Sequence, residues 1–143
     1  MVYANTSPIV KKYADEPGSA EVRDLIQRAN VVGTCVLSRA QAAAAFAKAI
    51  RTGSLPSSGA EACHAAFSRE WKHYVRIRIT EALIARADHL AWSLRLRGYT
   101  AVHLAAALHW SERLGETVVL ATFDRELWTA AGKAELEVFP ARL

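Results

Sequence analysis

The stretch that decides the fold is Arg97-Gly98-Tyr99-Thr100-Ala101-Val102-His103-Leu104-Ala105-Ala106-Ala107-Leu108. It opens a predicted helix over residues 100–114, which should end at Gly115 because glycine commonly follows a helix C-terminus. A buried strand over 117–121 follows and leads into Thr122-Phe123-Asp124. Near the start of the chain, Ala4-Asn5-Thr6-Ser7 follows a short apolar strand in the same way. These segments put polar side chains where strands and loops give way to helices.

The bulk composition indicates one domain over residues 1–143. Its 52% apolar and 22% charged residues are typical of an ordinary soluble globular protein. No apolar run approaches the roughly 18 residues that cross a membrane, and the first residues lack the pattern of a signal peptide. A cytoplasmic location is therefore expected. The net charge of +4 suits an acidic partner such as nucleic acid or an acidic peptide.

Predicted strands alternate with predicted helices along the chain. The strands are expected at 1–4, 31–36, 74–79, 117–121 and 136–139, and the helices at 7–13, 19–29, 38–52, 56–72, 80–96, 100–114 and 125–131. The alternating pattern of 74–79 indicates a half-exposed edge strand. This order predicts an α/β fold, a three-layer α/β/α sandwich around a five-stranded, mainly parallel sheet. Such sheets bind ligands at the C-terminal ends of their strands, near a topological switch point.

Four polar positions lie at those strand and loop ends: Asn5, Gln41, Thr100 and Asp124. Each of the last three also has a purely structural interpretation. Gln41 could be the return partner of a Ser38-x-x-Gln41 capping box, while Thr100 and Asp124 could be helix N-caps. Asn5 is not needed as a cap if Ser7 caps the first helix, so we expect Asn5 to line a cleft.

The segments around these positions resemble the PIN-domain ribonucleases, in particular the VapC-type toxins. The resemblance covers almost the whole chain and includes four motifs in the family's order. They are Asn5-Thr6-Ser7 with the Glu16-Pro17-Gly18 turn, Gln41 early in an alanine-rich helix, Thr100-Ala101-Val102-His103-Leu104-Ala105, and Thr122-Phe123-Asp124-Arg125-Glu126-Leu127. The resemblance implies a PIN-like fold.

The family builds its metal site from four acidic residues that hold Mg²⁺ or Mn²⁺ for RNA hydrolysis. Here only Asp124 is acidic, and Asn5, Gln41 and Thr100 stand at the other three positions. Amides keep a carbonyl oxygen that could face a cation, but they lose the negative charge. The resemblance therefore implies weak or absent metal binding, centred on Asp124. Asp15 and Glu16 are poor substitutes, because they lie roughly 12 Å along the first helix.

Further residues are expected to surround this site. The hydroxyls of Ser7 and Thr122 are candidates for supporting it. Arg95 and Arg97 either form an RNA-binding rim or belong to a solvated basic face. His103 is interpreted as a half-buried packing residue. The loss of three carboxylates predicts a more positive cleft at converging helix N-termini, suited to phosphate or another anion without a metal.

Three functions stay open at this stage. The leading one is a VapC-like PIN domain with weak or no RNA cleavage that retains RNA and antitoxin binding, as a homodimer and with no membrane association. The second is an active Mg²⁺- or Mn²⁺-dependent endoribonuclease toxin with a reduced ligand set. The third is a structural partner subunit. A dinucleotide-binding fold is excluded, because no Gly-x-Gly-x-x-Gly motif follows a strand.

Overall fold

A computed structural model describes residues 1–143. Its centre is a five-stranded sheet in the order β3-β2-β1-β4-β5, and every neighbouring pair of strands is parallel. The strands are β1 (Val2–Ala4), β2 (Val32–Cys35), β3 (Val75–Ile77), β4 (Val119–Ala121) and β5 (Glu137–Phe139). The predicted α/β class and five strands are confirmed. Each strand is one to three residues shorter than predicted.

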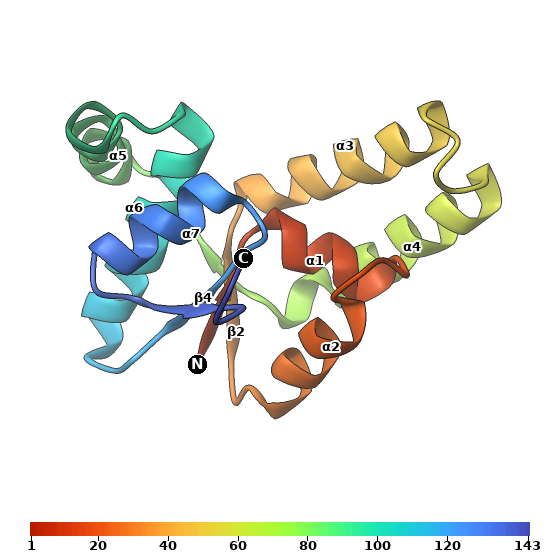
Figure 1. Ribbon diagram of the computed structural model, residues 1–143, viewed down its shortest axis with the longest axis horizontal. Helices are drawn as coiled ribbons and strands as arrows, with labels where there is room; N and C mark the ends of the chain where they lie inside the picture. The colour runs from red at the N-terminus through yellow and green to blue at the C-terminus, as the bar shows by residue number, and fades with distance from the viewer.

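Helices cover both faces of the sheet (Figure 1). One face carries α5 (Glu81–Leu94), α6 (Gly98–Leu114) and α7 (Arg125–Lys133), and the other carries α1 (Thr6–Tyr13), α2 (Ser19–Arg28), α3 (Leu37–Arg51) and α4 (Ser57–Glu70). A short 3-10 helix, η1 (Trp71–His73), links α4 to β3. The result is the expected three-layer sandwich. None of the helices is both long and apolar enough to span a membrane.

Two groups of buried side chains flank the sheet. The larger group joins Tyr3 of β1 and Leu120 of β4 to the alanine-rich face of α6. The second group packs α1, α3 and α4 around Phe46, Phe67 and Trp71. The small side chains of α6 let that helix lie close to the sheet, and this close packing leaves no spare room at Gly33 of β2.

The connections at the centre of the sheet create a topological switch point. β1 and β4 are neighbours, with Ala4 opposite Ala121. The chain leaves β1 for α1 on one face and leaves β4 for α7 on the other (Figure 1). Such a divergence opens a crevice at the C-terminal strand ends. Asn5 and Asp124 follow these two strands closely, so both are brought to the crevice.

Three of the predicted helix starts are wrong. The N-cap of α1 is Asn5, whose side chain accepts a hydrogen bond from the Ser7 backbone N–H, so Ser7 is not the cap. α3 begins at Leu37 without any side-chain cap, so the Ser38 and Gln41 capping box does not form. α6 begins at Gly98, which puts Thr100 inside its first turn. The side chains of Ser7, Gln41 and Thr100 instead form hydrogen bonds with residues distant in sequence.

The predicted N-cap at Asp124 is confirmed, because its side chain accepts from the backbone N–H groups of Glu126 and Leu127. The edge position of β3 is also confirmed. In that strand Val75 and Arg76 are exposed and Ile77 is buried.

A methyl group at Gly33 tests the close packing of α6 on the sheet. A Cβ there would lie 2.6 Å from Cζ3 of Trp110, inside any acceptable contact distance. We expect Gly33→Ala to lower the free energy of unfolding by about 1–3 kcal/mol, measured by urea denaturation. The matched control is Gly132→Ala in α7, where nothing lies within 4 Å. It should be neutral or raise stability by up to about 1 kcal/mol. Equal effects at both sites would contradict this account.

Candidate functional site

A cleft of about 550 Å³ opens at the C-terminal ends of β1 and β4. All four positions singled out by the family resemblance line it: Asn5, Gln41, Thr100 and Asp124. They come from the end of β1, from α3, from α6 and from the start of α7. The fold thus brings together residues that are far apart in sequence, at the switch point where ligands bind in parallel sheets.

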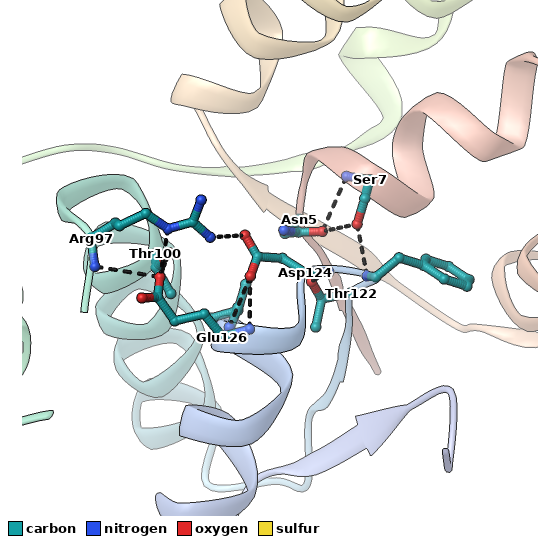
Figure 2. A network of polar contacts seen from close by, with 9 residues as sticks. Asn5, Ser7, Arg97, Thr100, Thr122, Asp124 and Glu126 are labelled. Atoms are coloured by element: carbon teal, nitrogen blue, oxygen red, sulfur yellow. Dashed lines mark hydrogen bonds and ion pairs between the residues drawn. The ribbon is translucent and has the colours of Figure 1, made fainter. Parts of the chain in front are cut away.

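Asn5 uses its side-chain oxygen entirely within the protein. Oδ1 accepts hydrogen bonds from the Ser7 backbone N–H at 3.1 Å and from Ser7 Oγ at 2.9 Å. Ser7 Oγ in turn accepts from the Phe123 N–H at 2.8 Å, so Ser7 connects the ends of β1 and β4. In Figure 2 the Asn5 oxygen faces Ser7 and the nitrogen faces away from it. The nitrogen Nδ2 has no partner within the protein and is not sealed from solvent.

Gln41 is held in a similar way. Its Oε1 accepts from Thr6 Oγ1 at 2.6 Å and lies 2.8 Å from Nε2 of His103. Because a carbonyl oxygen only accepts, Nε2 of His103 must carry the proton. The other ring nitrogen, Nδ1, then accepts from the hydroxyl of Tyr3 at 2.8 Å. Nε2 of Gln41 makes no hydrogen bond within the protein.

The remaining carboxylates form a closed network with Arg97 (Figure 2). Asp124 Oδ1 accepts the N–H groups of Glu126 and Leu127, at 2.9 and 3.2 Å, and Oδ2 accepts from Arg97 Nη2 at 2.8 Å. Glu126 Oε2 accepts from Arg97 Nε at 2.9 Å and from Thr100 Oγ1 at 2.6 Å. Thr100 therefore donates its hydroxyl proton to a neighbouring acid.

This network affects the ionisation of its members. The Thr100 hydrogen bond, followed by that of Arg97, lowers the pKa of the Glu126 carboxyl below its ordinary value. The hydrogen bond to Glu126, together with the charges of Asp124 and Glu126, raises the pKa of Arg97. Glu126 and Arg97 both stay charged at neutral pH, and Arg97 acts as the counter-ion of two carboxylates.

The residues present do not fit the divalent cation that the family resemblance implies. Mg²⁺ and Mn²⁺ need several oxygen ligands, usually anionic. The oxygens of Asn5 and Gln41 are used inside the protein, and both Asp124 oxygens already accept hydrogen bonds. No group of three or more His, Cys, Asp or Glu side chains could hold a metal ion. In this structure the amide carbonyls of Asn5 and Gln41 face Ser7, Thr6 and His103.

The lining of the cleft carries no net charge, so it is more positive than it would be with carboxylates at positions 5, 41 and 100, but it is not cationic. Two cations and two carboxylates line the cleft, and each cation is paired: Lys11 Nζ lies 3.1 Å from Glu16, and Arg97 pairs with Asp124. Glu16, predicted to be a poor substitute ligand, lines the same cleft and pairs there with Lys11. The turn after α1 folds back and brings it there.

The other predicted residues divide into two groups. Ser7 and Thr122 both stabilise the site, since Thr122 Oγ1 accepts from the Asp124 N–H at 3.0 Å. Arg97 lies at the cleft, but Arg95 does not; its guanidinium is 5.1 Å from the ring centroid of Trp92. Sequence reasoning missed Glu126. The sequence feature that could have indicated Glu126 is its place as an acidic residue in the first turn of α7, a helix that begins at the site.

Comparison with known proteins gives the chain its family. Ribonuclease VapC45 of Mycobacterium tuberculosis (strain CDC 1551 / Oshkosh) and Ribonuclease VapC49 of Mycobacterium tuberculosis (strain ATCC 25618 / H37Rv) are each 32% identical to it over 144 aligned positions. The alignments cover 100% of this chain and 97% of each relative. The chain belongs to the VapC family of PIN-domain ribonucleases. No protein-family model matches this VapC-family chain.

Solved structures share the fold of this VapC-family chain at low sequence identity. FitAcB from Neisseria gonorrhoeae superimposes with a TM-score of 0.66 at 15% identity, covering 97% of this chain and 96% of that one. A toxin-antitoxin complex from Klebsiella pneumoniae has a TM-score of 0.56 at 9% identity, covering 83% and 84%. These similarities establish the PIN-type architecture alone.

His103 is more deeply buried than predicted, because it lies under the cleft between Tyr3 and Gln41 with an exposed fraction of 3%. Burial lowers the pKa of its imidazole to about 4, against a small opposing effect of the Asp124 charge. The ring is therefore neutral at pH 7, as its two hydrogen bonds require.

The depressed pKa predicts a pH-dependent stability. The unfolded chain binds a proton at His103 near pH 6.5, and the folded chain does so only near pH 4. Stability from this group is present above pH 6.5 and is lost as the pH falls. Urea denaturation should show a loss of about 2 kcal/mol between pH 6.5 and about pH 4.5.

The variant His103→Gln, which cannot titrate, should remove most of this pH dependence while lowering stability at pH 7. His89→Gln, at an exposed position on α5, is the matched control and should keep it. An unchanged pH dependence in His103→Gln would show that other groups are responsible.

Proposed function

We propose that this protein is a VapC-like PIN domain whose endoribonuclease site is substituted, so that RNA cleavage is weak or absent while RNA and antitoxin binding are retained. One observation carries this proposal. Every side-chain oxygen at the three substituted positions is turned into the protein or onto Glu126, and the Asp124 carboxylate is occupied by its helix and by Arg97. Such an arrangement leaves no free carboxylate oxygen on Asp124, the acidic residue among the four positions.

Partner binding is supported by other features. The chain carries a net charge of +4, which favours RNA. A structural neighbour is described as a toxin-antitoxin complex, which supports an antitoxin partner for this chain. The family resemblance adds a homodimer, to be checked by light scattering coupled to size-exclusion chromatography.

The competing function, an active Mg²⁺- or Mn²⁺-dependent endoribonuclease, is favoured by one specific observation. Asp124 and Glu126 lie close enough to share Arg97, whose side chain is 68% exposed. Movement of Arg97 would leave two adjacent carboxylates at the mouth of the cleft. A metal-dependent activity of the wild-type chain would have to use Asp124 and Glu126 as its acidic ligands.

The test compares wild-type protein with a variant in which the acids are restored. Purified wild type should cleave tRNA and structured RNA no faster than background, with either Mg²⁺ or Mn²⁺. It should also bind no Mn²⁺ in calorimetry at concentrations that load ordinary sites. The triple variant Asn5→Asp, Gln41→Glu, Thr100→Asp should bind Mn²⁺ and cleave RNA, because each restored carboxylate supplies a hard anionic ligand.

The control is the triple variant with Asp124→Ala added, which should lose both Mn²⁺ binding and cleavage. Cleavage by wild type that disappears in Asp124→Ala would overturn the proposed function in favour of the active enzyme. Contaminating nuclease is recognised by cleavage that survives Asp124→Ala.

A further inference from the structure

Two side-chain amides face the cleft with their donors outward. Asn5 is 7% exposed, so it is buried over more than nine-tenths of its surface, yet its Nδ2 has no partner within the protein. No polar side-chain atom of the chain is both sealed from solvent and without a hydrogen bond, so Nδ2 must reach the solvent of the cleft. Gln41, which lines the same cleft, likewise leaves Nε2 without a partner.

Neighbouring groups hold both amides in the orientation that the structure shows. Ser7 offers Asn5 a backbone N–H, which only the amide oxygen can accept, and its hydroxyl donates to the same oxygen. Rotating the Asn5 amide by half a turn would set its NH₂ group against that N–H, so the NH₂ group stays on the cleft side. Gln41 Oε1 faces Thr6 Oγ1 and Nε2 of His103, which leaves the Gln41 NH₂ group on the cleft side as well.

This arrangement reverses the polarity of the cleft. A carboxylate held by the same neighbours would use one oxygen inward and present the other, an anionic acceptor, to the cleft. An amide presents an NH₂ group there instead. The face that a carboxylate would offer to a cation now offers hydrogen-bond donors, which a cation avoids and an oxyanion accepts.

The chemistry of the remaining lining decides which ligand suits these donors. The lining has no net charge, since its two cations are paired with its two carboxylates, so the ligand needs no high charge. Arg97 keeps Nη1 free of hydrogen bonds within the protein. A group with several acceptor oxygens suits a cleft that both amides line, and α1 and α6 add the partial positive charge of their N-termini.

We propose that this cleft binds a phosphate group directly and without a metal ion, with Asn5 Nδ2 and Gln41 Nε2 as the donors. This proposal rests on the proposed function and deepens it, because it names the chemical group through which the substituted site would hold RNA. The same chemistry would accept a phosphodiester of RNA or free inorganic phosphate. Thr6, Ser7 and His103 are positioning residues in this site, since they act through the two amides.

The sequence makes a direct test simple, because the chain contains only two asparagines and two glutamines. Asn5 and Gln41 lie in the cleft, whereas Gln27 and Asn30 are exposed at the end of α2 and after it. Uniformly ¹⁵N-labelled protein should therefore show four side-chain NH₂ pairs. We would titrate it, in EDTA, with inorganic phosphate and separately with a short oligouridylate that lacks terminal phosphates, at ionic strength matched by chloride.

The NH₂ resonances of Asn5 and Gln41 should shift with saturation, while those of Gln27 and Asn30 stay in place. Shifts with inorganic phosphate alone would assign the site to free phosphate, and shifts with both probes would assign it to RNA phosphodiesters as well. Absence of any saturable shift, equal shifts of all four pairs, or shifts that appear only when Mg²⁺ replaces EDTA would overturn the proposal.

A pair of variants gives the matched control. Asn5→Asp with Gln41→Glu should weaken phosphate binding in EDTA by about tenfold or more, because each change replaces a donor by an anion. Aspartate is as good an N-cap as asparagine, so α1 keeps its start. Gln27→Glu with Asn30→Asp makes the same charge change away from the cleft and should alter binding by less than about threefold.

The outcomes separate this inference from the proposed function. Oligouridylate that binds wild type and the cleft double variant equally, with the cleft amides unmoved, would defeat the phosphate site and leave RNA binding intact. Inorganic phosphate that moves the cleft amides, with no binding of oligouridylate, would support the phosphate site and remove RNA binding from the proposed function.

Discussion

The parallel pairing of β1 with β4 is the constraint on which the site depends. Ala4 lies opposite Ala121 at the centre of the sheet, and both strands end at the same edge. Because the chain leaves these strands in opposite directions, side chains that follow them face one crevice. The backbone of Asn5 donates to the Ala121 carbonyl, and Ser7 accepts from the Phe123 N–H, so the two strand ends are also joined beyond the sheet.

A second layer of side chains determines what the crevice offers to a ligand. Ser7, Thr6 and His103 hold the oxygens of Asn5 and Gln41 inward, and the Tyr3 hydroxyl, in the middle of β1, lies 2.8 Å from the other ring nitrogen of His103. The resulting donors face outward. The two amides therefore present donors on the ligand side, where carboxylates held in the same way would present acceptors.

Arg97 has a related role on the opposite side of the cleft. It pairs with Asp124 and Glu126 and thereby supplies, from within the chain, positive charge to the carboxylates that remain. Thr100 also donates to Glu126 Oε2, so Arg97, Thr100 and the two carboxylates form one hydrogen-bond network. The charges of the cleft consequently balance, although the chain as a whole is basic.

Much of the fold could be predicted because periodicity and turn residues report local structure. The alternation of apolar strands with helices led to the five-stranded parallel sheet, and Asp124 was recognised as an N-cap from its place before a helix. The capping interpretations of Ser7, Gln41 and Thr100 failed for one shared reason. Their hydroxyl or amide groups bond to residues distant in sequence, and propensity carries no information about such partners.

The sequence by itself determined the chain's membership in the VapC family and the residues that stand at positions 5, 41, 100 and 124, since both depend on residue identity and order. The predicted strand and helix order also placed Asn5, Gln41, Thr100 and Asp124 at one edge of the sheet, where they line one cleft. Only the tertiary structure decided which atoms of those residues face a ligand, because an amide's orientation depends on the donors around its oxygen. The tertiary structure also decided the partners of Glu126 and Arg97. Arg97 bonds to Asp124 and Glu126, and Thr100 bonds to Glu126, across 26 to 29 residues of sequence. These residues meet because α6 packs against α7.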